Sequence, residues 1–228
     1  MAFPRIIIFI GPPGSGKGTQ AQFLVDALTG YEHIDTGRII ARVIHDSKNQ
    51  DDPIVRVQRE RVEKGILVES DWAVGVIQES IRAAAARGAG VIFSGSPRKR
   101  EEADTLLPFL EQLYGVDSRV IFHIKIKEEV AARRNIKRKI CSKCNTPVAE
   151  TSETKDIAFC LLCGGELRVR VDDKPEVMPT RLAEYRRLTE VLLPYFTALG
   201  IPIYEINGEE TPQEVQHAIL TTLTEKYS

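Results

Sequence analysis

The stretch GPPGSGK, from Gly11 to Lys17, lies directly behind an apolar run, Ile6 to Ile10. Its spacing, G-x-x-x-x-G-K, is that of a phosphate-binding loop between a strand and a helix. Glycines let backbone N–H groups converge on phosphate oxygens, and the helical pattern that follows points its positive end at the same place. The alternative is a glycine-rich turn without a ligand. The buried type of strand before the loop and the helical pattern after it favour a nucleotide site.

Around this loop, apolar runs alternate with helical patterns. Further buried strands are predicted at residues 91–93, 120–126 and 201–206, and helices at 16–28, 70–87, 101–114, 127–140, a long stretch ending near 199, and 212–227. Such alternation is typical of an α/β fold, a three-layer sandwich around a parallel sheet. Ligands of these sheets bind at the carboxyl ends of the strands, which is where the phosphate loop lies.

Two segments interrupt the alternation and are predicted to be insertions. Residues 35–68, called the flap below, contain two helical patterns joined around Asp51-Asp52-Pro53. Residues 137–173, called the lid below, contain all the cysteines. The remaining residues, 1–34, 69–136 and 174–228, are expected to form the core domain that carries the phosphate loop.

Composition narrows the class of protein. The chain has 228 residues, of which 43% are hydrophobic and 28% charged, and its formal net charge is −1. A charge so close to zero gives no overall field that would favour nucleic acid or an anionic membrane. The apolar run near the N-terminus is too short for a signal peptide or a membrane span. We therefore expect a soluble cytoplasmic protein with no membrane partner.

The cysteines form two C-x-x-C pairs, Cys141/Cys144 and Cys160/Cys163, separated by fifteen residues. Four thiolates at this spacing can close a tetrahedral zinc shell, and Gly164-Gly165 suits the tight turn that such a site needs. With no open coordination position the zinc would be structural, and it would stabilise a segment with few apolar residues. Iron or a disulfide is the alternative. The histidines are scattered, and no role follows for them.

The longer string GPPGSGKGTQ, Gly11 to Gln20, closely resembles the opening of adenylate kinases and related nucleoside monophosphate kinases, in which Gly18 and then Thr19 follow the lysine. The resemblance spans nearly the whole chain. In that family one inserted flap covers the monophosphate, and the other insertion, the lid, covers ATP. Lids with four cysteines occur in part of the family.

The resemblance implies roles for particular residues. The catalytic cations would be Lys17, Arg98, Arg134, Arg138, Arg170 and Arg181. ATP would contact Gly11, Pro12, Gly14, Ser15, Gly16, Lys17, Gly18, Thr19, Arg134 and Arg138. The monophosphate would contact Thr36, Val68, Gly95, Arg98, Glu102, Arg170 and Arg181. From the residues alone, Arg134 and Arg138 are four apart and would share one face of the predicted helix 127–140. The alternative for this basic cluster is a solvated patch, and for Thr36 a cap on the next helix.

Three positions depart from the family pattern. Where the family has an arginine for the phosphate of the monophosphate, this chain has Ala41. Where the family has an aspartate near magnesium, it has Ser94. Where the family has a glutamine that recognises adenine, this chain has Glu102, whose carboxylate can only accept hydrogen bonds. Guanine, with donors at N1 and N2, would suit such a group, unless Glu102 points to solvent.

The sequence thus predicts a nucleoside monophosphate kinase, most simply an adenylate kinase catalysing Mg·ATP + AMP ⇌ 2 ADP. Its partners would be ATP, AMP and ADP, its cofactors Mg²⁺ and a structural Zn²⁺, and its state a monomer. Three alternatives stay open: a kinase of another monophosphate such as GMP, a nucleotide-binding regulator without catalysis, and a nucleic-acid-binding zinc ribbon on an ATPase. The net charge speaks against the last of these.

Overall fold

The computed structural model describes residues 3–136, 139–143, 147–148, 154, 156–161, 163–169 and 175–227. Three residues that the sequence places in the site, Arg138, Cys144 and Arg170, lie outside these ranges. Within the described ranges, no helix is both long enough and apolar enough to cross a membrane.

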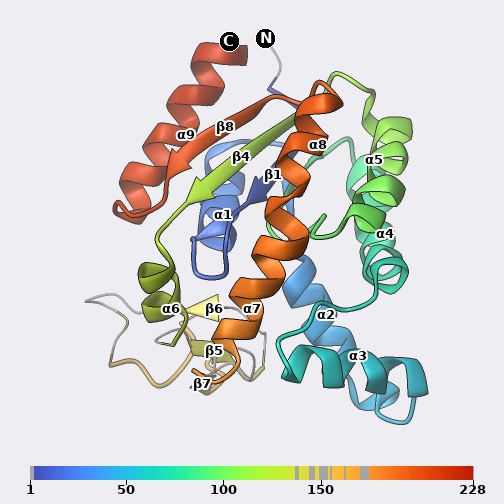
Figure 1. Ribbon diagram of the computed structural model, residues 1–228, viewed down its shortest axis with the longest axis vertical. Coiled ribbons are helices and arrows are strands. Elements are labelled where there is room, and N and C mark those ends of the chain that lie inside the picture. The colour runs from blue at the N-terminus through green and yellow to red at the C-terminus, as the bar shows by residue number, and fades with distance from the viewer. Residues whose placement is uncertain are drawn as a thin grey trace.

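A central sheet of five parallel strands has the order β2-β3-β1-β4-β8 (Figure 1). Its strands are β1 (Ile6–Ile10), β2 (Tyr31–Ile34), β3 (Gly90–Phe93), β4 (Arg119–Lys125) and β8 (Ile203–Asn207). In register, Ile7 of β1 pairs with Ile92 of β3 on one side and with Val120 of β4 on the other. The apolar run before the phosphate loop is therefore the central strand, and the predicted parallel α/β sheet is confirmed.

Helices cover both faces of this sheet. Side chains of β1 alternate between two cores: Ile6, Ile8 and Ile10 belong to one, and Ile7 and Phe9 to the other. The first core is closed by α4 (Ser70–Ala86), α5 (Arg100–Tyr114) and α8 (Leu192–Ala198), and the second by α1 (Lys17–Ala27) and α9 (Pro212–Tyr227). These layers lie on opposite sides of the strands in Figure 1. A run of five apolar residues is required because β1 is buried on both faces.

One long helical stretch runs along the first core. It consists of α7 (Met178–Glu184), a π-helical turn η3 (Tyr185–Glu190) and α8, one after the other in Figure 1. Pro179 lies in the first turn of α7, where its missing N–H costs nothing. The π-helical turn shifts the side chains that follow it, and such turns are frequent at functional sites.

The flap consists of α2 (Thr36–His45), a short 3₁₀ turn η1 (Ser47–Asn49) and α3 (Pro53–Glu63). The side chain of Asp35 caps α2 by accepting a hydrogen bond of 3.0 Å from the backbone N–H of Arg38. Asp52 caps α3 through the N–H of Ile54 at 2.8 Å. The cap of α2 is thus Asp35, and the interpretation of Thr36 as a cap is wrong.

The described part of the lid forms a small antiparallel sheet of the order β6-β5-β7. It follows α6 (Glu128–Ile136) and contains β5 (Lys139–Cys141), β6 (Pro147–Val148) and β7 (Leu167–Val169). The predicted helix 127–140 is therefore too long, because Lys139 already pairs with Val169 of β7. Strand β2 was not predicted, because it is an edge strand whose residues are mostly half-buried and do not form a continuous apolar run.

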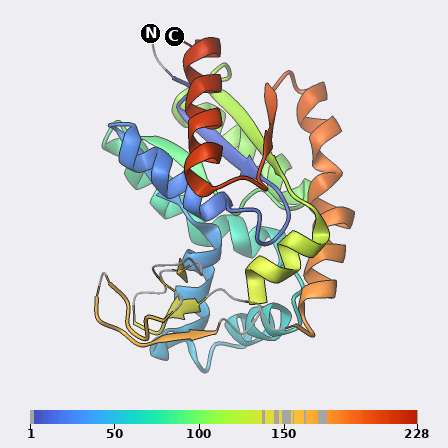
Figure 2. The same ribbon diagram turned by 90° about the vertical axis from the view of Figure 1, so that its left-hand side faces the viewer.

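Figures 1 and 2 both show the flap helices and the lid strands at the same end of the molecule. The arrowheads of β4 and β8 point to that end in Figure 1. Both insertions therefore lie beyond the carboxyl ends of the parallel strands, where open α/β sheets bind their ligands.

Candidate active site

The loop after β1 has the tight geometry that its glycines allow. Gly14 has a φ of 83° and Gly16 a φ of 92°, conformations that other residues rarely adopt. A Cβ on Gly14 would lie 2.7 Å from the carbonyl oxygen of Ala131 in α6. Glycine at position 14 thus lets the loop pass directly against the helix that leads into the lid.

Lys17 begins α1 and reaches back over this loop. Its ammonium donates hydrogen bonds of 2.8 Å to the carbonyl oxygens of Gly11 and Pro12. The side chain therefore lies along the turn that the loop makes, in the position from which it can serve phosphates bound by the loop amides.

A cavity of about 570 Å³ lies in front of the loop, and it is called the ATP cavity below after the ligand that the family resemblance implies. The family-derived ATP residues Gly14, Ser15, Gly16, Lys17, Gly18, Thr19 and Arg134 line it. The opposite wall is the segment Gly208–Pro212 after β8, for which no sequence motif predicts a role. Arg134 holds that wall, because its guanidinium donates to the carbonyls of Gly208 at 2.6 Å and Glu209 at 3.2 Å.

A second cavity, of about 240 Å³ and called the flap cavity below, lies between α2, the end of the flap and the turn after β3. It brings together six of the residues expected to contact the monophosphate, namely Thr36, Val68, Gly95, Arg98, Glu102 and Arg181. They come from four separate parts of the chain. The seventh, Arg170, is outside the described residues.

Glu102 is buried at this cavity, with 2% of its surface exposed. Its carboxylate accepts hydrogen bonds from the backbone N–H of Arg98 at 2.8 Å and from the hydroxyl of Ser96 at 3.4 Å. Burial raises the pKa of Glu102, and the bond from Arg98 opposes that shift. The interpretation that Glu102 points to solvent is therefore wrong: it fixes the turn that carries Arg98.

Thr36 and Ala41 lie on α2 beside the same cavity. The hydroxyl of Thr36 is buried and has no hydrogen-bond partner in the described part of the chain. Buried hydroxyls are normally paired, so this one is available to a ligand in the cavity. Ala41 presents only a methyl group, so this position contributes no positive charge to the cavity.

Arg98 and Arg181 line both cavities. They also line a small cavity of about 70 Å³ that reaches Lys17. The two guanidiniums therefore lie where a group bound at the phosphate loop and a group bound under the flap would meet. Phosphoryl transfer requires positive charge at that meeting point.

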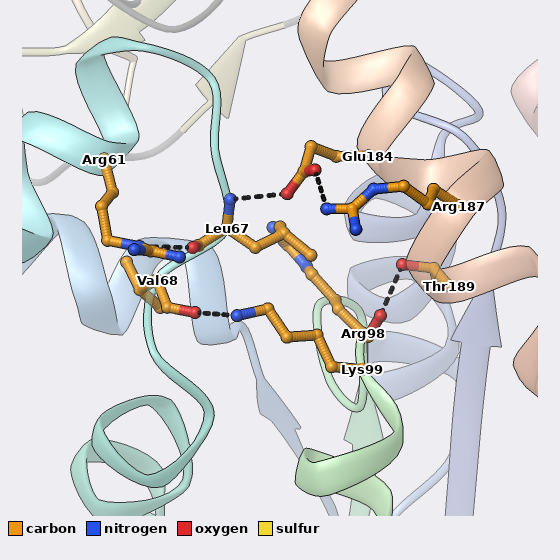
Figure 3. Close-up of polar contacts among 8 residues, drawn as sticks. All are labelled: Arg61, Leu67, Val68, Arg98, Lys99, Glu184, Arg187 and Thr189. Atoms are coloured by element: carbon orange, nitrogen blue, oxygen red, sulfur yellow. Dashed lines mark hydrogen bonds and ion pairs between the residues drawn. The ribbon is translucent and has the colours of Figure 1, made fainter.

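Hydrogen bonds tie the end of the flap to the core, as Figure 3 shows. The backbone N–H of Leu67 donates to Glu184 of α7 at 3.3 Å, and Lys99 donates to the carbonyl of Val68 at 2.6 Å. Burial lowers the pKa of Lys99. The segment that forms one wall of the flap cavity is thus held from both the helix α7 and the turn after β3.

The π-helical turn holds Arg98 from the other side. The hydroxyl of Thr189, in η3, donates a hydrogen bond of 2.8 Å to the backbone carbonyl of Arg98 (Figure 3). The backbone N–H of the same arginine donates to Glu102. Both backbone groups of Arg98 are therefore fixed by hydrogen bonds.

Ser94 and His33 form a pair that no sequence pattern predicts. The Nε2 atom of His33 lies 2.7 Å from the hydroxyl of Ser94, across the neighbouring strands β2 and β3. Burial lowers the pKa of His33, so the neutral ring is favoured. Ser94 lines the ATP cavity together with Asp35. Only the missed strand β2 brings the histidine to this place.

Three of the four cysteines converge in the lid. The Sγ atoms of Cys141, Cys160 and Cys163 all lie within 4.8 Å of one another, with Cys141 and Cys163 3.4 Å apart. Gly164 has a φ of 69°, and a Cβ on Gly165 would lie 2.7 Å from the Cys141 sulfur. Both glycines are therefore needed for this turn, as predicted. Converging thiols in a turn of this kind fit a soft tetrahedral metal such as zinc.

Comparisons with known proteins agree with this geometry. The family model described as adenylate kinase matches residues 9–201. The chain is 31% identical over 225 residues to the adenylate kinase of Desulforamulus reducens, an alignment that covers 95% of this chain and 99% of the relative. It is 33% identical over 221 residues to the adenylate kinase of Borreliella burgdorferi, with 96% and 99% covered. Against that of Clostridioides difficile it is 30% identical over 218 residues, with 95% and 97% covered.

Proposed function

The chain belongs to the adenylate kinase family, and from this premise we propose that it transfers the terminal phosphoryl group of Mg·ATP to AMP, giving two ADP. One observation carries the proposal. A cavity at the phosphate loop and a cavity under the flap share two arginines, Arg98 and Arg181. An enzyme that moves a phosphoryl group between two nucleotides needs two such sites joined at a positive centre.

On the donor side, the loop amides and Lys17 hold the ATP phosphates, and Arg134 positions the wall behind them. Gly11, Pro12, Gly14, Ser15, Gly16, Gly18 and Thr19 complete the loop, with Arg138 as a further cation. Magnesium neutralises charge on the bound phosphates. Asp35 and Ser94 line the same cavity, and their side chains carry the hard oxygen donors that suit Mg²⁺.

On the acceptor side, the monophosphate contacts Thr36, Val68, Gly95 and Glu102, and Arg98, Arg170 and Arg181 neutralise its phosphate and the transferring group. Arg98 is prepared for this role, because its backbone is held by Glu102 and Thr189. Preorganised charge lowers the barrier without any rearrangement during the reaction.

The core, the flap and the lid have separate roles in the proposed reaction. The core consists of residues 1–34, 69–136 and 174–228, the flap of 35–68 covers the monophosphate, and the lid of 137–173 covers ATP. Together they exclude water, which would otherwise take the phosphoryl group. We propose that the protein acts as a monomer. Cysteines gathered as metal ligands favour a reducing compartment, and we place the protein in the cytoplasm.

The lid contains a structural zinc ion held by Cys141, Cys144, Cys160 and Cys163. The support for this is the convergence of the three described thiols and the two glycines at the turn. A closed set of four thiolates leaves no position for substrate, so the metal stabilises the lid and takes no part in the chemistry.

A second acceptor, GMP, is favoured by one observation. The carboxylate of Glu102 is buried at the flap cavity, and it can only accept hydrogen bonds when ionised. Adenine offers an acceptor at N1, whereas guanine offers donors at N1 and N2. If a carboxylate oxygen reaches the base, GMP competes with AMP.

A coupled assay with ATP as donor and AMP, dAMP, GMP, CMP or UMP as acceptor tests the proposal. We expect turnover with AMP at the highest kcat/KM, with GMP the next candidate. Turnover with GMP and not with AMP would show that GMP is the acceptor. If the protein binds both nucleotides but turns over no acceptor, the proposed enzymatic activity is contradicted, and a nucleotide-binding regulator without catalysis is indicated instead.

A further inference from the structure

The strand β7 of the lid carries an arginine that faces the flap cavity. Arg168 lies opposite Ile140 of β5 in the antiparallel register, and both residues line the cavity. The neighbouring pair, Cys141 and Leu167, is buried in the cluster that contains the metal-binding thiols. Because side chains alternate between the faces of a sheet, the lid sheet turns one face to the thiols and the other to the cavity.

The charge at this cavity is unevenly supplied. Arg98 and Arg181 line the flap cavity, but they line the ATP cavity too, so two ligands share their charge. Arg168 lines the flap cavity and neither of the other two cavities. On the flap side, Ala41 brings no charge.

Arg168 is also chemically suited to an external anion. Its side chain is exposed, and its guanidinium has no carboxylate partner in the described part of the chain. A phosphate monoester carries close to two negative charges and accepts two parallel hydrogen bonds from the planar guanidinium fork. The nucleoside part of the ligand has no comparable charge.

We propose that Arg168 binds the phosphate of the acceptor nucleotide, so that the lid supplies the positive charge that Ala41 does not supply from the flap. This inference rests on the proposed function, because it assumes a nucleoside monophosphate in the flap cavity. It adds a second contact between the lid and the acceptor phosphate, made from β7, beside the one proposed above for Arg170.

The first test is the steady-state kinetics of Arg168→Ala. A hydrogen bond to a charged group is worth roughly 1.5–3 kcal/mol, so the KM for AMP should rise about tenfold to a hundredfold while the KM for ATP stays unchanged. Arg168→Lys keeps the positive charge but loses the planar guanidinium fork, so its KM for AMP should lie between those of the wild type and Arg168→Ala. Arg42→Ala is the matched control: it removes the same charge from an exposed position beside Ala41, outside the cavity lining, and should leave both KM values unchanged.

Adenosine separates the phosphate from the rest of the acceptor, because it has the same base and sugar without the charge. Its inhibition constant against AMP should be the same for the wild type and Arg168→Ala. An equal loss of affinity for adenosine and AMP would overturn the phosphate assignment.

The rescue Ala41→Arg in the Arg168→Ala background restores a cation to the same cavity from the flap. We expect it to recover most of the lost affinity for AMP. A wild-type KM for AMP in Arg168→Ala would overturn the inference while leaving the kinase activity standing. An inactive wild type would instead contradict the proposed function, so the two failures are distinguishable.

Discussion

At the scale of single residues, Ser94 is the position with the clearest consequence for rate. Ser94 lines the ATP cavity, and its hydroxyl lies 2.7 Å from Nε2 of His33. A hydroxyl can orient a water bound to magnesium, but it brings no charge to hold the ion. Ser94 is therefore a weaker partner for magnesium than the carboxylate usual in the family.

We expect Ser94→Asp to raise kcat, or to lower the magnesium concentration at which the rate saturates. One preorganised electrostatic group is typically worth about 10²–10³ in rate, so the gain should be easily measurable. The measurement is a magnesium titration of the forward reaction for both proteins. A variant that is slower at every magnesium concentration would show that Asp35 or another acidic group already fills this role.

Glu102 has a consequence for stability. Its pKa is raised by burial, so the folded protein binds the proton more tightly than the unfolded chain does. Stability therefore falls as the pH rises from about 4.5, the ordinary pKa of a glutamate, through the raised pKa of the folded state. Above this pH range the Glu102 carboxylate is ionised in the folded protein, and its desolvation lowers the free energy of unfolding.

Glu102→Gln removes this cost but keeps an oxygen that can accept from Arg98 and Ser96. We expect its melting temperature to exceed that of the wild type at pH 7 and the difference to shrink toward zero near pH 4.5. The control is Glu101→Gln, an exposed neighbour with the same change in charge, which should show no such trend. A lower melting temperature for Glu102→Gln at pH 7 would mean that the bonds of the ionised carboxylate outweigh its burial.

At the scale of elements, the lid depends on its thiol cluster. Its described apolar cluster is small and includes Cys141, Cys160 and Leu167, so packing alone offers little stability. Structural zinc sites of this kind often supply the folding free energy of the segment that holds them.

Removal of the metal, or the double variant Cys141→Ser/Cys160→Ser, should unfold the lid, lower the melting temperature and reduce activity. Metal content per chain by elemental analysis and a melting curve measured with and without chelator give the readouts. An unchanged melting curve together with no bound metal would contradict the zinc site.

The same elements show where sequence reasoning works. The central strand β1, the phosphate loop and the glycines of the cysteine turn were predictable because their signals are local: an apolar run and fixed spacings. Strand β2 was missed because an edge strand needs no continuous apolar run. The helix predicted over 127–140 is longer than α6 because the residues after Ile136 have a helical pattern. In the structure, Lys139 instead pairs with Val169 of β7, which is distant in the sequence.

The candidate site divides in the same way. Arg98, Arg181 and Thr36 were expected from the family motif, and the structure brings them to one cavity. The bond between His33 and Ser94 and the position of Arg168 depend on strand register between distant segments. No spacing within the sequence records such a register, so neither could be predicted.

At the scale of the whole molecule, the parallel sheet ends where the two insertions meet (Figures 1 and 2). Its central strand delivers the phosphate loop to the ATP cavity, and the turn after β3 delivers Arg98 to both cavities. Helix α7 adds Arg181 and also ties the end of the flap to the core. The architecture therefore places the ATP cavity and the flap cavity on either side of one positive centre, Arg98 and Arg181.

The most direct measurement starts from ADP as the only nucleotide, with magnesium, and follows all products by ³¹P NMR. The account predicts that ATP and AMP appear in equal amounts, and that Lys17→Ala, which loses the ammonium for the phosphates, forms neither while keeping the wild-type melting temperature. Unchanged ADP with the wild-type protein would contradict the account. So would AMP released with inorganic phosphate and no ATP, because the protein would then be a hydrolase.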